Sequence, residues 1–216
     1  MSRGPTGRCM GAVLVGALAL CAECFGQGTM RVGFEGPAYP GAPQPQPRGT
    51  YVTISQYSES GMRFWNPYGL ENLTLMGGGL SGEADNGTAY LNAAGGARVG
   101  FGLISGQYFD LLAIDAAESQ TGPVTLQFVG YHTMGRTVTN YFTLDGVNDG
   151  TGPLQDFQTF YPDSEFLQVY RVDVLTDRWS LDNLVIGGVP EPSAGALMLL
   201  GAAFAMGQSR RRRKNI

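Results

Sequence analysis

Short segments in which hydrophobic and polar residues alternate recur along most of the chain. Residues 50–57 read TYVTISQY and residues 123–132 read PVTLQFVGYH, so each would place its hydrophobic side chains on one face of a β-strand. Similar patterns predict strands at residues 29–35, 61–67, 88–93, 97–103, 137–145, 155–160, 166–175 and 179–186. Turn sequences such as Asp85-Asn86-Gly87 separate several of these segments.

The segment at residues 108–118 (YFDLLAIDAAE) is more uniformly hydrophobic and fits either a short helix or a buried strand. Its length and the strands predicted around it favour a strand. About ten short strands separated by turns are typical of an all-β sandwich or barrel. Of these architectures we expect a jelly-roll-like β-sandwich at residues 27–187.

Both ends of the chain differ from this pattern. At residues 1–26, Arg3 and Arg8 precede an apolar run, which predicts an N-terminal signal peptide. A retained membrane anchor is the alternative, but the run is short for a membrane span. At residues 188–216, a second apolar run at residues 194–207 predicts a short transmembrane helix, with the basic residues after it on the cytoplasmic side.

The charge and the cysteines narrow the function classes. The chain has 14 basic and 18 acidic residues, and many of the basic ones lie in the two terminal segments. The body is therefore acidic, which argues against nucleic acid as a partner. All three cysteines, Cys9, Cys21 and Cys24, fall in the predicted signal peptide, so we expect no disulfide or thiolate metal site in the body.

The C-terminal segment combines three features in a fixed order. Pro190-Glu191-Pro192 comes first, the apolar run follows, and a basic block ends the segment. The basic block consists of Arg210, Arg211, Arg212, Arg213 and Lys214. This order resembles the PEP-CTERM sorting signal of Gram-negative bacteria. The resemblance implies recognition and processing by an exosortase near the Pro-Glu-Pro motif, with the basic block as a membrane stop. It also implies an envelope or extracellular destination and an association with exopolysaccharide.

The predicted first and last strands carry a second resemblance. Gly33-Phe34-Glu35 and Leu181-Asp182-Asn183 are similar to sequences at the two ends of carbohydrate-binding-module jelly rolls. The resemblance implies a structural calcium near Glu35 and Asp182, and calcium does prefer hard oxygen ligands of this kind. The alternative is that Asp182 and Asn183 form local hydrogen bonds at a strand turn.

Candidate chemistry in the body is sparse. Asp110, Asp115 and Glu118 are close in sequence, but on a strand their spacing does not define the carboxylate pair of a glycosidase. No catalytic residues are predicted, and we expect a non-catalytic protein. For ligand binding, the candidates are Trp65 and Tyr68, since they flank a turn and aromatic rings stack on sugars. For Trp65 itself, a place in the core is favoured over exposure.

Together these features predict an exported surface or matrix protein, sorted by an exosortase and associated with exopolysaccharide. We expect it to pass through the inner membrane by its C-terminal segment before reaching the envelope, the cell surface or the extracellular matrix. Two alternatives remain open. One is a glycan-active hydrolase or lyase using Asp or Glu, and the other is a structural adhesin that associates with itself.

Overall fold

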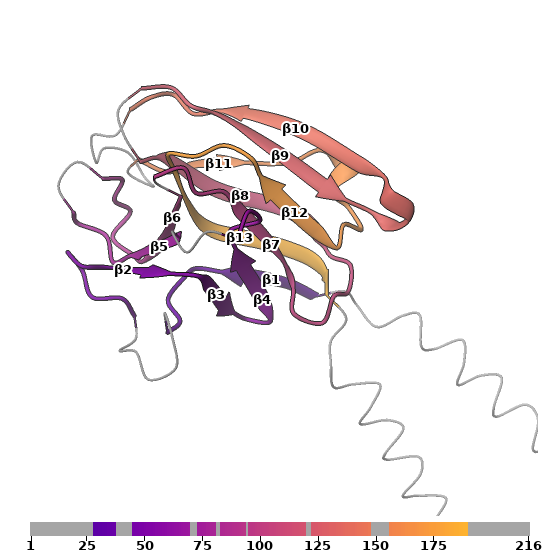
Figure 1. The fold of residues 1–216 in the computed structure, drawn as a ribbon, viewed down its shortest axis with the longest axis horizontal. Coiled ribbons are helices and arrows are strands. Elements are labelled where there is room, and N and C mark those ends of the chain that lie inside the picture. The colour runs from indigo at the N-terminus through magenta and orange to yellow at the C-terminus, as the bar shows by residue number, and fades with distance from the viewer. Residues whose placement is uncertain are drawn as a thin grey trace, which may run out of the picture. The chain divides into compact units, whose positions relative to one another are not determined.

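Two antiparallel sheets pack face to face in the computed structural model and form a β-sandwich (Figure 1). The structure describes residues 28–37, 45–69, 73–80, 83–93, 95–119, 122–147 and 156–189. Within this part of the chain, Thr29–Val189 form one compact unit. The predicted β-sandwich is therefore confirmed.

The first sheet has seven strands. Their order is β11 (Gln158–Phe160), β8 (Asp110–Glu118), β13 (Trp179–Val189), β6 (Tyr90–Ala93), β5 (Leu73–Met76) and β2 (Tyr51–Ile54), and β1 (Gly28–Val32) also pairs with β13. The last strand of the chain, β13, thus lies between β8 and β6 in the interior of the sheet. β13 makes its longest ladder with β8, over residues 179–187.

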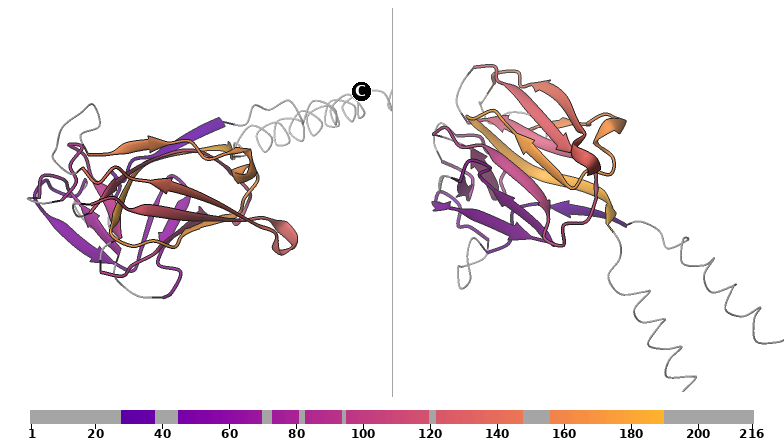
Figure 2. Two further views of the ribbon diagram at one scale, coloured as in Figure 1. Left: turned by 90° about the horizontal axis from the view of Figure 1, so that it is seen from above. Right: turned by 45° about the vertical axis from the view of Figure 1, so that its right-hand side comes forward.

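The second sheet has six strands and forms the other layer (Figure 2). Their order is β10 (Thr137–Thr143), β9 (Thr125–Tyr131), β12 (Arg171–Val174), β7 (Val99–Leu103), β4 (Met62–Trp65) and β3 (Gln56–Glu59). Two short 3-10 turns, Thr133–Gly135 and Ser164–Phe166, accompany it. Buried and exposed residues alternate along β4 and β9, so each strand presents one face to the core and the other outward.

The core between the sheets is rich in aromatic side chains. Phe64 lies 5.0 Å from Phe34 and 5.8 Å from Phe101, measured between ring centroids, and Phe101 lies 6.3 Å from Phe109. All four are fully buried. Trp179 extends the core at the start of β13, where its ring lies 6.1 Å from that of Phe128. This packing holds together a body that has no cysteine.

Most predicted strands occur in the structure, and β8 settles the ambiguous segment as a strand. Residues 50–57, predicted as one strand, instead form β2 and β3, which belong to different sheets. The buried residues on either side of the break, Ile54 and Tyr57, are three positions apart, so one straight strand could not turn both inward.

Two further differences concern strand limits. The strand expected at residues 166–175 is shorter, because a 3-10 turn ends at Phe166 and Gln168 has a left-handed φ of 57°. The regular strand, β12, begins only at Arg171. β5 was not predicted, since its LTLM sequence is too short to show a periodicity.

Candidate functional site

A β-bulge in β13 shapes the surroundings of Asp182, one of the two predicted calcium ligands. Asp182 pairs with Asp115 and Val185 pairs with Ala113, so three steps along β13 match two along β8. Inside the bulge, Asn183 has a left-handed φ of 46°, a conformation that asparagine tolerates better than most residues. A bulge redirects the side chains beside it.

The Asp182 carboxylate is fully buried and hydrogen-bonded on both oxygens. Its Oδ2 accepts a hydrogen bond from Asn86 Nδ2 and lies 3.2 Å from Thr88 Oγ1, whose one proton it shares with Asn86 Oδ1. Its Oδ1 accepts one from the Asn183 N–H at 2.7 Å. Burial raises the pKa of Asp182 to about 7, although these hydrogen bonds act in the opposite direction. The local hydrogen bonding considered as the alternative to calcium is therefore present.

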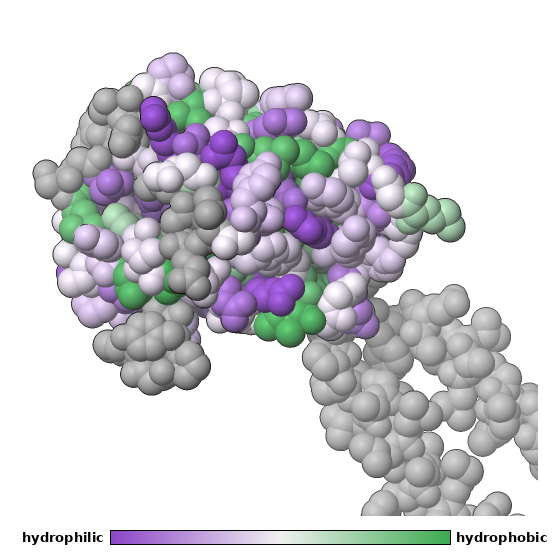
Figure 3. Space-filling view, viewed as in Figure 1, coloured by the Kyte–Doolittle hydropathy of each residue, from purple (hydrophilic) through white to green (hydrophobic). Residues whose placement is uncertain are grey.

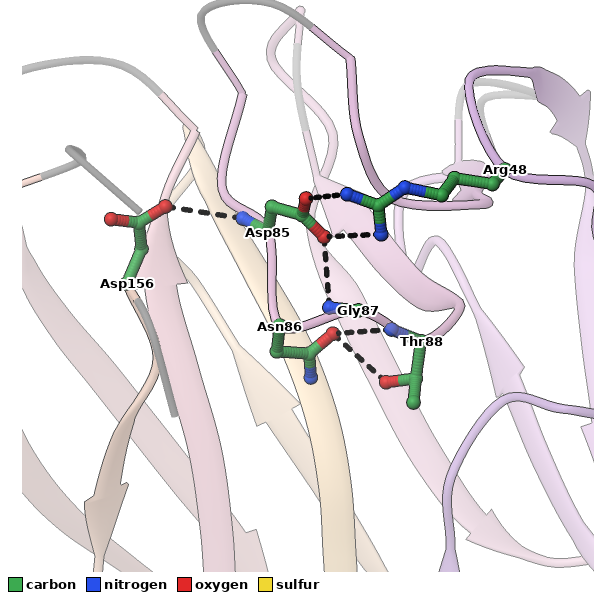
Figure 4. Close-up of polar contacts among 6 residues, drawn as sticks. All are labelled: Arg48, Asp85, Asn86, Gly87, Thr88 and Asp156. Atoms are coloured by element: carbon green, nitrogen blue, oxygen red, sulfur yellow. Dashed lines mark hydrogen bonds and ion pairs between the residues drawn. The ribbon is translucent and has the colours of Figure 1, made fainter. Parts of the chain in front are cut away.

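The turn at residues 85–88, which supplies two of these donors, is built from its own side chains (Figure 4). Asp85 Oδ1 accepts a hydrogen bond from the Gly87 N–H at 2.8 Å. Asn86 Oδ1 accepts from Thr88 twice, from the N–H at 3.1 Å and from Oγ1 at 2.8 Å. Such side-chain bonds to nearby backbone are the reason Asp and Asn favour turns.

Two loops tie the same turn to the rest of the sandwich (Figure 4). Arg48 Nη2 lies 2.5 Å from Asp85 Oδ2, and the Asp85 N–H donates to Asp156 Oδ2 at 3.1 Å. Because the Arg48 side chain is 60% exposed, this ion pair adds little to the stability of the fold, and its main effect is to position the turn. Sequence reasoning identified the turn from its Asp-Asn-Gly sequence but not these partners, which lie far away in the chain.

Glu35, the second predicted calcium ligand, reaches the next residue of this segment. Its Oε1 accepts a hydrogen bond from the Ala89 N–H at 2.9 Å. Glu35 lies just after the first strand, β1, and Asp182 lies in the last strand, β13. Their carboxylates accept hydrogen bonds from one short segment, residues 86–89. Oxygens of two carboxylates, an amide and a hydroxyl thus occur here, which is the donor chemistry that calcium selects.

The acidic residues alone do not complete a metal site. Within the described ranges, no group of three or more His, Cys, Asp or Glu side chains is placed to hold a metal ion. A calcium ion bound by Glu35 and Asp182 would take further ligands from amide, hydroxyl or main-chain oxygens. The calcium site stays a prediction.

If calcium is bound there, a chelator is expected to lower the melting temperature of the protein by several degrees, because a ligand that binds only the folded state stabilises it. Differential scanning calorimetry with and without chelator measures this. Asp182→Asn should abolish the response. Asp163→Asn, at an exposed aspartate that caps a 3-10 turn, should retain it. An unchanged melting temperature of the unsubstituted protein would count against calcium.

The three carboxylates considered for catalysis are engaged in holding the fold. Asp115 accepts hydrogen bonds from Thr159 Oγ1 at 2.5 Å and from Asn183 Nδ2 at 2.8 Å. Asp110 accepts one from the backbone of Gln168 at 2.8 Å. The fully buried Glu118 accepts one from the backbone of Gly146 at 2.5 Å. Each carboxylate thus anchors a neighbouring segment.

Trp65 and Tyr68 lie in different surroundings. Trp65 ends β4 on the outward face of the six-stranded sheet and is only partly buried, so it does not belong to the core. Tyr68 stands in the following turn, where its side chain is 64% exposed and its N–H donates to Asn66 Oδ1 at 3.0 Å. Among the ring contacts of the described residues, none joins Trp65 to Tyr68.

Sequence reasoning missed the residues that do contact Trp65. The Arg171 guanidinium lies 5.4 Å from the centre of the Trp65 ring and 5.1 Å from that of Tyr131. It also forms two hydrogen bonds of 2.7 Å with Asp173. The one available signal was the spacing of Arg171 and Asp173, because residues two apart on a strand share a face.

The predicted sorting residues lie outside the described part of the chain. These are Pro190, Glu191, Pro192, Arg210, Arg211, Arg212, Arg213 and Lys214. The predicted signal peptide also lies outside it. In the ranges that the structure describes, no helix is long and apolar enough to cross a membrane.

Comparisons with known proteins give little further information. No model of a protein family matches the sequence, and no curated protein matches it. Among solved structures, a DUF4465 family protein from Bacteroides caccae is similar at a TM-score of 0.39 and 12% identity, over 76% of this chain and 93% of that one. A similarity this distant carries no argument about function.

Proposed function

We propose that this protein is an exported, non-catalytic surface or matrix protein of a Gram-negative bacterium, sorted by an exosortase and associated with exopolysaccharide. One observation carries the proposal, namely the order of Pro190-Glu191-Pro192, an apolar run and a basic block. This order resembles the PEP-CTERM sorting signal. The acidic body without cysteine is compatible with such a destination.

In this proposal the chain has three parts. A signal peptide at residues 1–26 directs export, and a jelly-roll-like sandwich at residues 27–187 is the delivered body. The segment at residues 188–216 crosses the inner membrane as a short helix and is held there by its basic block. An exosortase then processes it near Pro190-Glu191-Pro192, and the body reaches the envelope, the cell surface or the extracellular matrix.

Mass spectrometry of the protein recovered from its own host tests the proposal. The expected product begins near residue 27 and ends near residues 190–192, with or without an attached group. Replacing Pro190, Glu191 and Pro192 together by alanine should leave the basic block uncleaved and the protein in the membrane fraction. Met134→Gln is the control, because Met134 is fully exposed in the body and its replacement should not affect processing.

Recovery of an intact C-terminus from the unsubstituted protein, in a host that has an exosortase, would overturn the proposal. Equal processing of the triple-alanine variant and the control would do the same, since the motif would then have no role in sorting.

A further inference from the structure

Two glycines in β7 make room for neighbouring side chains on the outward side of the six-stranded sheet. Along β7, Val99 and Phe101 enter the core, so Gly100 and Gly102 face outward. A Cβ added to Gly100 would lie 2.8 Å from Asp173 Oδ1 and 3.0 Å from Trp65 Cε2. The side chains of the neighbouring strands therefore occupy the space that a residue at position 100 would fill.

The two strands next to β7 place an aromatic ring and an ion pair over the backbone of Gly100 and cover it. Trp65 pairs with Gly100 from β4, and Asp173 pairs with Gly100 from β12. The Asp173 side chain is 3% exposed and accepts two hydrogen bonds from the Arg171 guanidinium. This bidentate pair fixes the orientation of the guanidinium and neutralises its charge. This fixed guanidinium lies between the rings of Trp65 and Tyr131.

Arg63 differs from Arg171 because it has no ion pair among the described residues. It is exposed on β4, and its guanidinium carbon lies 5.0 Å from the centre of the Trp65 ring. In the part of the chain that the structure describes, a cation outside any ion pair thus rests on an aromatic ring, on a body that is acidic as a whole.

Tyrosines continue this surface toward one end of the sheet. The ring of Tyr170 lies 6.4 Å from that of Tyr131 and 6.4 Å from that of Tyr108. Tyr170 and Tyr108 are each 39% exposed. In Figure 3, drawn from the same side as Figure 1, pale and purple side chains prevail and the hydrophobic green ones gather only in small patches.

We propose that Trp65, Arg63, Arg171, Tyr131 and Tyr170, here named the arginine–tryptophan platform, bind an anionic polysaccharide through its carboxylated sugar residues. The proposal rests on the proposed association with exopolysaccharide and specifies its chemistry. The exposed parts of the aromatic rings contact the apolar faces of pyranose rings. Arg63 pairs with the carboxylate of a uronic acid, because a guanidinium matches a carboxylate in geometry and charge.

Charge and chemistry favour this ligand over others. Nucleic acid binding depends mainly on several cations that contact phosphates, and the platform offers only Arg63 for such contacts. A uronic-acid glycan differs because its pyranose faces can lie on the aromatic rings while a single carboxylate pairs with Arg63. A hydrophobic protein partner would need a broad apolar surface, but the platform consists of amphipathic rings and guanidinium groups. A neutral glycan would leave the charge of Arg63 without a counterpart.

Oligogalacturonate and its fully methyl-esterified form make a matched pair of probes, since esterification replaces each charged carboxylate by a neutral methyl ester and leaves the sugar rings unchanged. Binding to the purified full-length protein in mild detergent is measured by titration calorimetry and by tryptophan fluorescence. The chain has two tryptophans, and Trp179 is fully buried, so a change in fluorescence reports on Trp65. We expect the acid form to bind and change the fluorescence, and the ester to bind at least tenfold more weakly.

Arg63→Gln is expected to weaken binding of the acid form about tenfold without unfolding the protein, because Arg63 is exposed. Arg178→Gln is the matched control, since Arg178 is also exposed and forms no ion pair among the described residues, yet lies in the loop before β13. It should bind as the unsubstituted protein does.

Several results would overturn the platform. Three of them concern the glycan: no binding of oligogalacturonate, equal binding of the acid and the ester, or an equal loss of affinity in Arg63→Gln and Arg178→Gln. The fourth is a dimer of the protein that Arg63→Gln abolishes, because this face would then bind a second copy of the chain. These results are separate from the sorting test. Correct processing without glycan binding removes the platform alone, whereas glycan binding by a protein that is not processed removes only the sorting proposal.

Discussion

Replacing Trp179 by alanine is expected to lower the free energy of unfolding by about 3–5 kcal/mol. The Trp179 side chain is fully buried at the start of β13, where its ring packs against Phe128. Its Nε1 donates a hydrogen bond to the Thr176 carbonyl at 3.0 Å. Alanine would leave a cavity between the sheets and an unpaired carbonyl. Urea denaturation followed by circular dichroism measures the loss.

Trp65→Ala is the informative comparison, because both substitutions remove the same side chain. Trp65 is only partly buried on the outer face of the sheet, so we expect a loss of about 1–2 kcal/mol. The two substitutions should therefore affect different properties. Trp179→Ala should mainly lower the stability of the fold, whereas Trp65→Ala should leave the protein folded and abolish the proposed glycan binding. A loss for Trp65→Ala as large as that for Trp179→Ala would contradict the placement of Trp65 outside the core.

Without calcium, the protein is expected to become less stable as the pH rises from about 4 to about 8. The unfolded state has an Asp182 pKa of about 3.9, whereas in the folded state burial raises it to about 7. The folded state therefore retains a proton that the unfolded state releases. The resulting stabilisation is complete below about pH 4 and is lost as the pH rises through 7, with a span of at most about 4 kcal/mol.

Melting temperatures measured in chelator between pH 5 and pH 8 test this expectation. Asp182→Asn should flatten the profile in part, since burial also raises the pKa values of Glu83 and Glu118 and leaves a residual slope of the same sign. Met134→Gln, at a fully exposed residue whose side chain does not titrate, should leave the profile unchanged. Identical profiles for the unsubstituted protein and Asp182→Asn would rule out Asp182 as a source of the pH dependence.

The alternation of hydrophobic residues predicted strands well where one face of the strand is buried and the other exposed, as in β9. The prediction failed where the fold forces the chain to change sheet or to adopt a left-handed conformation. The break between Ile54 and Tyr57 moves the chain from one sheet to the other, and the positive φ of Gln168 delays β12. Neither feature has a glycine or proline at its centre to mark it in the sequence.

The sites were predictable to different degrees. The end motifs named Glu35 and Asp182 as a pair, but only the fold shows that residues 86–89 join them. Trp65 was recognised as a ligand candidate from its neighbouring turn. Its partner Arg171 lies more than a hundred residues away in the chain and meets it only because β7 lies between β4 and β12.

The interior position of β13 has a consequence for the folding of a growing chain. β8 and β6 flank this strand, and β1 pairs with it as well, so three earlier parts of the chain find their partner only in residues 179–189. A polypeptide that emerges with its N-terminus first cannot complete the seven-stranded sheet until this last strand has followed. During synthesis the body therefore remains incompletely folded until residues 179–189 are available, and this final strand then closes the sandwich.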